Sequence, residues 1–375
     1  MKINTIFTKR FFYKKDISTL LRNKYLSRLL LLVEEKAVTI RETIEQMEAK
    51  TLSPYATLSQ NSRGRQYPEA QCDIRPLFQR DRDRILHCKA FRRLKNKTQV
   101  FLDPQGDHYR TRLSHTLEVS QNARTIAKAL RMNEDLVEAI ALGHDLGHTP
   151  FGHCGELVLD QLCPTGFVHS EQSVRIVEKL EKDGKGLNLT WEVRDGIRNH
   201  QTETTPATPE GKIVRLSDKI AYVNSDIDDA IRANLLSEDD IPLEIRKTLG
   251  FNVNDRLNRL IHDVIMSSMD SPDICMSDEV YEAMQDLRHY LFDNVYRNPV
   301  AKGEEVKAKR MIAQLYEYYM EHFEDLPQKY RNMVTEDGEA KERVICDYIS
   351  GMTDQFACMK FSEFFVPVSW QLREY

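Results

Sequence analysis

The chain has 375 residues, of which 41% are hydrophobic and 30% charged, and its formal net charge is −5. This composition supplies enough apolar side chains for a sizeable core and excludes disorder over most of the length, while the slightly acidic balance gives no general affinity for nucleic acid or anionic membranes. No apolar run approaches the roughly 20 residues of a membrane span, and seven cysteines with no C-x-x-C pair and no secretory signal favour reduced thiols in a cytoplasmic protein.

A basic segment comes first. Residues 1–36 carry nine Lys or Arg against three acids, with one short apolar run at residues 29–33. A targeting peptide is one interpretation, but the run is too short and too late for the apolar region of a secretory signal. A loosely held basic extension over residues 1–37 is therefore favoured.

Helical patterning dominates the rest of the chain. It begins near Thr39, gives way to a polar stretch at 53–70 that is typical of a loop, and resumes from Asp81. Helices are predicted over residues 112–130, 134–148, 170–182, 190–200, 212–235, 276–296, 303–324 and 339–358. Because almost no alternating strand pattern and no fixed-period repeat is found, the predicted fold class is all-α.

Local signals mark the ends of two of these helices. Asn133 is the predicted N-cap of the helix over 134–148, and Gly147 and Pro150 are predicted to close it. Thr190 is the predicted N-cap of the helix over 190–200.

Two predicted helices have clear buried faces. The inward residues of the helix over 112–130 are expected to be Leu113, Leu117, Ala123, Ile126, Ala127 and Leu130. Those of the helix over 212–235 are expected to be Ile213, Leu216, Ile220, Val223, Ile227 and Ile231. The other face of the second helix carries Asp218, Tyr222, Ser225, Asp226 and Asp229 at spacings of three and four.

Histidines are concentrated in one part of the sequence. Eight of the eleven lie between His87 and His200, and the stretch HDLGHTPFGHCGE at residues 144–156 holds three of them. A buried histidine is costly unless its ring nitrogens are paired or bound to metal. The concentration therefore indicates one functional site.

Four residues form a candidate set of metal ligands: His115, His144, Asp145 and Asp218. Two imidazoles and two carboxylates suit a divalent ion such as Mn²⁺, Mg²⁺, Fe²⁺ or Co²⁺. Neighbouring residues on a helix diverge by about 100°, so His144 and Asp145 can reach one ion only at a helix end, where Gly147 lies. A second His-Asp pair, His262-Asp263, is interpreted as surface helix.

The order H…HD…D resembles that of the HD-domain metal-dependent phosphohydrolases. The segments HYRTRLSHTLEVSQNAR, EAIALGHDLGHTPFGHCGE, FVHSEQSVRIV and RLSDKIAYVNSDIDDAI are similar to the bacterial deoxyguanosine triphosphate triphosphohydrolase (dNTPase) branch of that family. The resemblance implies an HD-domain helical fold over residues 38–375, with a metal-binding core at about 110–235 and additional C-terminal helices at about 240–375. It also implies a homotetramer or homohexamer. Family members often begin near the position of Val38, so residues 1–37 are alternatively a translation-start artefact.

The resemblance implies hydrolysis of a deoxynucleoside triphosphate at the α-phosphorus, giving a nucleoside and tripolyphosphate. His153 and Glu156 match the family's catalytic pair, and residues three apart on a helix are neighbours; the alternative is a solvated surface pair. Substrate-binding positions of the family fall on Gln99, Arg112, His148, His169, Lys219, Tyr222 and Asp226. For His148 and His169, helix capping is the competing interpretation. Ser225 stands where close relatives are expected to have histidine.

A basic stretch at residues 75–97 has nine Lys or Arg against two acids. It is interpreted as a solvated helix face, as contacts to the phosphates of an effector dNTP between subunits, or as a groove for single-stranded nucleic acid, with nucleotide contacts favoured over nucleic acid. Phe78, Phe91 and Phe101 at these spacings are more typical of core.

Three functions compete on these observations. The first is a dNTP triphosphohydrolase, and the second is another HD-type nucleotide phosphohydrolase, such as a nucleotidase or alarmone hydrolase. The third is a nucleotide-sensing or single-strand nucleic-acid-binding protein with a vestigial metal site. The complete ligand set favours the first over the third.

Overall fold

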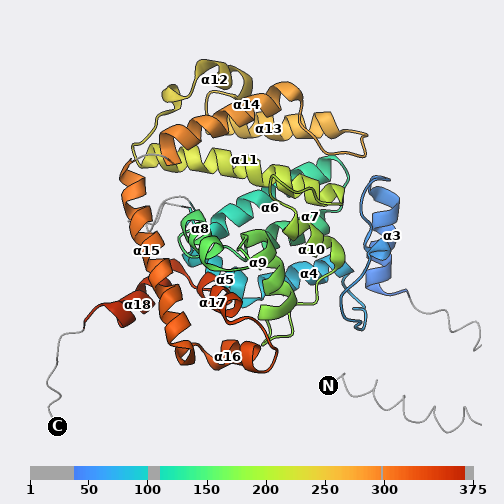
Figure 1. Ribbon diagram of the computed structural model, residues 1–375. Helices are drawn as coiled ribbons and strands as arrows, with labels where there is room; N and C mark the ends of the chain where they lie inside the picture. Colours follow the sequence, from blue (N-terminus) through green and yellow to red (C-terminus); the bar gives the residue numbers. More distant parts are fainter. Residues whose placement is uncertain (1–37, 100–109, 297–298, 368–375) are drawn as a thin grey trace, which may run out of the picture.

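The computed structural model describes residues 38–99, 110–296 and 299–367. These residues form α-helices joined by turns and loops (Figure 1). Among them, β-pairing is confined to two isolated bridges, Arg65–Thr190 and Thr98–Thr111. The predicted all-α class is thus confirmed, whereas the predicted extension over 1–37 and Phe101 lie outside the described residues.

The helices follow one another with short connections. They are α3 (Ile40–Thr51), α4 (Leu77–Leu86), α5 (Lys89–Arg93), α6 (Arg112–Ala129), α7 (Glu134–Gly143), α8 (His153–Leu162), α9 (His169–Arg175), α10 (Trp191–Arg198), α11 (Pro209–Arg232), α12 (Leu243–Leu249), α13 (Val253–Ser268), α14 (Asp278–Leu291), α15 (Pro299–Glu321), α16 (Gln328–Thr335), α17 (Lys341–Ser350) and α18 (Asp354–Phe365). π-helical turns extend α9 and α14.

Two predicted helix boundaries were wrong. The predicted helix over 339–358 is two helices, because Thr353 accepts a hydrogen bond from the Phe356 N–H at 3.2 Å and so begins α18. The predicted helix over 134–148 begins as expected, since the Asn133 side chain accepts from the Leu136 N–H at 3.2 Å. It ends at Gly143, so the His-Asp pair follows the last turn.

Thr190 occupies the N-cap position of α10, as predicted, but its hydroxyl makes no capping hydrogen bond. Its backbone N–H instead donates to the buried Asp81 carboxylate at 2.7 Å. This bond ties the start of α10 to α4.

Helix α11 lies between two groups of helices. In Figure 1, α12, α13 and α14 lie on one side of it and α6, α7 and α10 on the other. Both of its faces are therefore covered: Ile213, Ile220 and Ile227 are fully buried as predicted, and so are Asp226 and Asp229 on the polar face. Leu216 and Ile231 pack on the core while partly buried.

Two residues lie where the sequence did not place them. Leu117 was predicted to be inward but is 51% exposed, because the covered side of α6 includes the polar Arg112 and His115, and the apolar pattern alone misplaced the face. Asp263 was predicted on a helix surface, but it is buried and accepts from the Ser277 N–H and hydroxyl, at 2.8 Å each. His262 is exposed as predicted.

A second apolar cluster joins α8 to the C-terminal helices. Leu159 of α8 packs in a group that includes Ile312 and Leu315 of α15 and Ile349 of α17, and α15 passes beside α8 in Figure 1. Because α8 begins at His153, the C-terminal helices help to fix that histidine. No helix in the described ranges is both long and apolar enough to cross a bilayer.

Candidate metal and phosphate site

The four predicted metal ligands come together from three helices. His115 projects from α6, His144 and Asp145 from the end of α7, and Asp218 from α11. Asp218 Oδ1 lies 3.0 Å from His115 Nε2 and 3.7 Å from His144 Nε2. Asp145 Oδ1 lies 3.7 Å from His144 Nε2. Ligand atoms of His115, His144 and Asp145 all lie within 4.8 Å of one another.

The tautomer of His144 fits a ligand role. Its Nδ1–H donates to the Ala141 carbonyl at 2.7 Å, so Nε2 carries the lone pair. That Nε2 is buried and has no hydrogen-bond partner among the described residues. A buried imidazole lone pair facing two carboxylates is the donor set that a divalent cation satisfies.

Both carboxylates are held in the charged form. Burial acts to raise the pKa of Asp145, but His144 and Arg112 outweigh it and bring this pKa well below the usual range. Arg112, at the start of α6, donates from Nη1 to Asp145 Oδ2 at 2.8 Å. The pKa of Asp218 is also lowered, because its hydrogen bond with His115 and its proximity to His144 outweigh burial.

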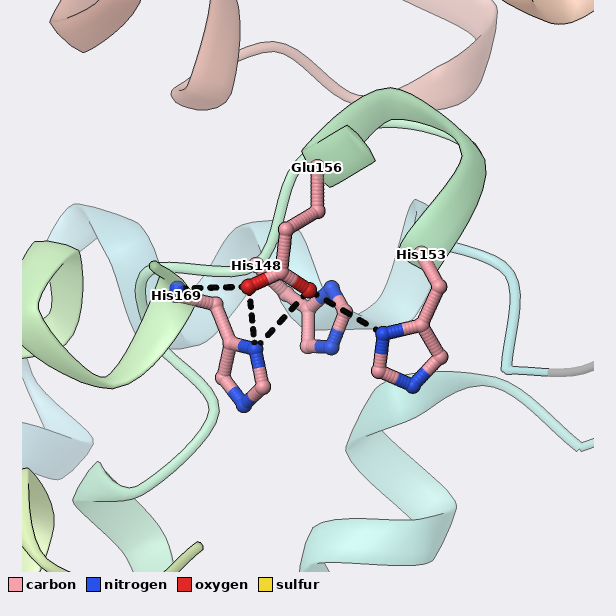
Figure 2. Close-up of side chains that lie close together, drawn as sticks. All are labelled: His148, His153, Glu156 and His169. Carbon is pink, nitrogen blue, oxygen red and sulfur yellow. Dashed lines mark hydrogen bonds and ion pairs between the residues drawn. The ribbon is translucent and has the colours of Figure 1, made fainter. Parts of the chain in front are cut away.

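Three further histidines surround one carboxylate. Figure 2 shows His148, His153 and His169 grouped around Glu156. His153 Nδ1 lies 3.0 Å from Glu156 Oε2, and His169 Nδ1 lies 2.8 Å from Oε1. The His148 and His169 rings stack with centroids 4.2 Å apart. The side chain of His153 is 75% exposed, whereas the other two rings are buried, so His153 lies at the open side of the group.

The protonation preferences in this cluster diverge. The pKa of Glu156 is lowered, because hydrogen bonds from His153 and His169 outweigh its burial. The pKa of His169 is raised, because its bond to Glu156 outweighs burial. The pKa of His148 is well below its usual value through burial and the nearby charge of Arg112. The cluster therefore holds an ionised carboxylate, one histidine whose protonated form is favoured, His169, and one whose neutral form is favoured, His148.

Two glycines shape the loop that carries these residues. A Cβ at Gly147 would lie 2.3 Å from the Ser173 nitrogen and 2.4 Å from the His169 carbonyl oxygen, so the loop passes directly against α9. Gly152, just before α8, has a φ of 57°, and Phe151 before it has a φ of 62°. This left-handed turn sets the direction from which His153 enters the site.

A cavity of about 230 Å³ opens over the metal ligands and the histidine cluster. The predicted residues on its wall are Gln99, Arg112, His115, Asp145, His148, His153, His169, Asp218, Lys219 and Tyr222. His144 and Glu156 lie behind this wall in contact with it. Asp226 is fully buried one turn beyond Tyr222 and is not among the lining residues.

Sequence reasoning missed five residues on the same wall: His200, Gln201, Thr202, Glu203 and Arg288. His200 Nδ1–H donates to the Ile197 carbonyl at 2.7 Å, and its Nε2 lies 3.3 Å from His169 Nε2. Burial, with His144 and His169 nearby, lowers its pKa to about 4. The concentration of histidines was a signal for His200. Arg288 comes from α14, and nothing local in the sequence marks it.

The basic stretch at 75–97 is partly neutralised within the fold. Arg82 pairs with Asp135 and Glu138, each at 3.2 Å, and Arg84 bonds Glu69 at 2.6 Å. Phe78 and Phe91 are buried core, as expected for these spacings. A second cavity of about 430 Å³ nevertheless opens beside this stretch, and its cationic lining residues are Arg75, Arg80, Arg84, Lys89, Arg92 and Lys182.

The chain is similar to known proteins over most of its length. Residues 112–223 match the HD domain, and residues 274–363 match the phosphohydrolase-associated domain. A deoxyguanosinetriphosphate triphosphohydrolase-like protein of Caldanaerobacter subterraneus is 56% identical over 331 residues, covering 88% of this chain and 97% of the relative. One of the same name from Clostridium perfringens strain 13 is 48% identical over 337 residues, covering 88% and 98%. A crystal structure of a hypothetical protein from Aquifex aeolicus aligns with a TM-score of 0.43 at 19% identity, over 75% of this chain and 67% of that one.

Proposed function

The chain belongs to the deoxyguanosinetriphosphate triphosphohydrolase-like family of HD-domain proteins, and we propose that it hydrolyses deoxynucleoside triphosphates to a deoxynucleoside and tripolyphosphate. One observation carries the proposal: a single cavity joins a divalent-metal ligand set, several cations and a histidine–carboxylate pair suited to proton transfer. Those are the groups that attack on a highly charged phosphate ester requires.

His115, His144, Asp145 and Asp218 are the residues that would hold the ion. When bound there, a divalent cation neutralises phosphoryl charge and lowers the pKa of water. Asp145 and Asp218 are both ionised and would balance the two positive charges of such a cation. The Ala141 carbonyl fixes the orientation of the His144 ring. Mn²⁺, Mg²⁺, Fe²⁺ and Co²⁺ all suit this ligand set.

Cations on the wall are proposed to bind the triphosphate. Arg112 is buried beside Asp145, and Lys219 and Arg288 approach from α11 and α14. Burial and the neighbouring charges of Arg215 and Arg288 lower the pKa of Lys219 to about 8. Mutually repelling cations in one cavity favour a polyanionic ligand, since each phosphate relieves that repulsion. His148 and His169 are proposed to donate or accept hydrogen bonds at the same phosphates.

His153 is the proposed acid for the leaving 5′-oxygen. Its Nδ1 faces the Glu156 carboxylate at 3.0 Å, so Nδ1 carries a proton and Nε2 remains to act on the substrate. Glu156 keeps the imidazole in this orientation and stabilises its charged form. The structure also has Glu156 bonded to His169, so the two rings share one carboxylate.

Gln99 and Tyr222 are the proposed sugar contacts. Gln99 Oε1 is buried without a hydrogen-bond partner among the described residues, which leaves it able to accept from a substrate hydroxyl. Asp226 is proposed to act on the 3′-hydroxyl. It is fully buried behind Tyr222, so this contact requires the sugar to reach past the wall of the described cavity.

We also infer that the second cavity binds an effector nucleotide in preference to single-stranded nucleic acid. The cavity of about 430 Å³ has six Arg or Lys side chains on its wall against three carboxylates, Asp83, Glu181 and Asp183, and this excess of positive charge suits one compact polyphosphate. Equilibrium binding of labelled dGTP and of labelled single-stranded DNA tests this inference, and tighter binding of the DNA would contradict it. The homotetramer or homohexamer remains a prediction, which light scattering tests.

A product assay tests the main proposal. The protein is incubated with Mn²⁺ or Mg²⁺ and each dNTP, singly and mixed, and nucleoside, tripolyphosphate, diphosphate and monophosphate are resolved. Nucleoside with tripolyphosphate supports attack at the α-phosphorus. Monophosphate would favour another HD-type nucleotide phosphohydrolase. Absence of turnover, with tight nucleotide or single-strand binding, would favour the sensing or nucleic-acid-binding function.

A further inference from the structure

A buried carboxylate from the C-terminal helices reaches two edges of the active-site cavity. Asp354, the first residue of α18, is 5% exposed. Its Oδ1 accepts from the Phe151 N–H at 3.0 Å, and its Oδ2 accepts from the Thr98 N–H at 2.8 Å and from the Thr98 hydroxyl. Phe151 lies two residues before His153, and Thr98 precedes Gln99.

The turn that Asp354 holds is an unfavourable one. Phe151 has a φ of 62°, a conformation that residues with a Cβ adopt only where surrounding contacts impose it. Gly152 follows as the N-cap of α8 and offers no side-chain cap. The bond from Phe151 to Asp354 is thus a contact that fixes the turn immediately before the proposed proton donor.

The neighbouring residue makes a second bridge between the same parts. Lys97 is buried, and its Nζ donates to the His148 carbonyl and to the Ser350 carbonyl, the latter at 2.8 Å. Residues 97–98 are therefore bonded to the turn at 148–151 and to the C-terminal segment at 350–354.

The carboxylate of Asp354 bonds residues outside its own helix. Thr353 supplies the N-cap of α18, and the three bonds of Asp354 all go to residues more than 200 positions away. Glu210 offers a matched comparison. It is fully buried and also accepts from two backbone N–H groups, of Thr57 and Asn133, and from the Thr57 hydroxyl, but it does not line the cavity.

We propose that Asp354 is a positioning residue of the reaction, which fixes His153 relative to Gln99. This inference rests on the proposed function. It gives the phosphohydrolase-associated region a direct part in the site, because residue 354 lies within it. A substrate held by its sugar at Gln99 meets His153 at the correct separation only while both edges are bonded to the one carboxylate.

The experiment compares Asp354→Asn with Glu210→Gln. Each change replaces one carboxylate oxygen by an NH2 group, which donates and cannot accept, so each variant should lose some thermal stability. Hydrogen–deuterium exchange should become faster at residues 97–99 and 148–156 in Asp354→Asn only. The kcat for dNTP hydrolysis should fall roughly 10- to 100-fold in Asp354→Asn and stay within about two-fold of wild type in Glu210→Gln. Thr98→Val, which removes only the hydroxyl bond, should give a smaller fall in the same direction and serves if Asp354→Asn does not fold.

A second arm separates positioning from general support. In a His153→Ala background the Asp354→Asn change should cost little further kcat, because the group that it positions is gone. The inference would be overturned if Asp354→Asn lowered kcat by the same factor in the His153→Ala background as in the wild type. Equal losses of kcat in Asp354→Asn and Glu210→Gln would also overturn it. If the wild-type protein hydrolyses no dNTP, the proposed function fails first. The exchange comparison then decides alone whether Asp354 holds both edges.

Discussion

The backbone N–H and the ring Nδ1 of His169 both face Glu156 Oε1, at 2.8 Å each. One carboxylate therefore fixes the position of the α9 terminus and the protonation of the first ring on it. The same carboxylate orients His153 from α8. The proposed phosphate contact, His169, and the proposed proton donor, His153, are thus bonded to the same carboxylate.

Glu156→Gln should lower kcat by about 10²- to 10⁴-fold while leaving bound metal unchanged. The carboxylate raises the pKa of His169, so its loss lowers that pKa. The proposed phosphate contact from the protonated ring of His169 is lost as pH rises through this pKa. The alkaline fall in kcat should therefore move to lower pH, which a pH–rate profile measures. Glu171→Gln on α9, the helix that begins at His169, is the control: its side chain is 56% exposed, and the change should leave the profile unchanged.

His144→Ala and His153→Ala should fail in different ways. His144 is a proposed ligand whose lone pair is oriented by Ala141, so its loss should remove metal and activity together. His153 is mostly exposed and bonded to Glu156, so its loss should keep the metal and reduce kcat by about 10²- to 10⁴-fold. Metal content by mass spectrometry, with kcat on the same preparations, distinguishes them. A His153→Ala enzyme with a near-normal rate would contradict the assignment.

Arg112→Met should show whether metal and arginine neutralise the same carboxylate. Without metal, it leaves the buried Asp145 charge uncompensated and should cost about 3–5 kcal/mol of unfolding free energy. With saturating Mn²⁺ the loss should be smaller, because the ion faces Asp145 as well. Urea unfolding in chelator and in Mn²⁺ measures both. Arg124→Met, at an exposed pair with Glu134, should change stability by under about 0.5 kcal/mol; equal losses for Arg112→Met in both media would remove Asp145 from the ligand set.

Lys97 predicts a particular pH dependence of stability. Burial and the charge of Arg93 lower its pKa from 10.5 to about 7. Between these values the unfolded chain binds a proton that the folded protein does not, so the contribution of Lys97 to stability becomes more favourable as pH rises through this window. Below about pH 7 the folded protein carries the buried ammonium group, and the full unfavourable contribution of Lys97 to stability is present. Lys97→Met should flatten the rise in unfolding free energy between pH 7 and pH 10; an unchanged slope would contradict the buried, neutral amine.

Leu159→Ala should destabilise the joint between α8 and the C-terminal helices. Leu159 is fully buried in that cluster, and such truncations cost about 2–5 kcal/mol. Leu157→Ala in the same helix is the control, since Leu157 is 46% exposed and should cost under about 0.5 kcal/mol. Denaturant unfolding at constant metal concentration compares them. Similar losses in both variants would show that the cluster is not the main contact of α8.

Much of the fold was predictable because helix signals are local. Asn133 caps α7 as its sequence indicates, and the apolar spacing of α11 gives the buried Ile213, Ile220 and Ile227. Leu117 was misplaced because the buried side of α6 is set by His115 and Arg112, whose burial depends on partners from α7 and α11. An apolar pattern carries no information about such partners.

The residues of the site also fall into two groups, those that local sequence signals predicted and those that they did not. The four candidate metal ligands were predicted from spacing and from residue chemistry, and the structure places their side chains close together. Arg288 and Asp354 could not be found that way, because they reach the site from helices more than 60 residues beyond Asp218 in the sequence. Only the packing of α14 against α11 and of the α18 terminus against the turn at 148–152 brings them close.

The contact of Gly147 with the α9 backbone also constrains how this protein can change over generations. Its N–H bonds the Ser173 hydroxyl at 2.8 Å, and no room exists there for even a methyl group. Any heavier side chain would displace His169, a proposed phosphate contact, relative to His144, a proposed metal ligand. A random library selected for turnover should thus recover glycine alone at position 147. Changes in substrate preference are expected instead at lining positions such as Gln201 or Glu203, whose substitution leaves the contact between Gly147 and α9 intact.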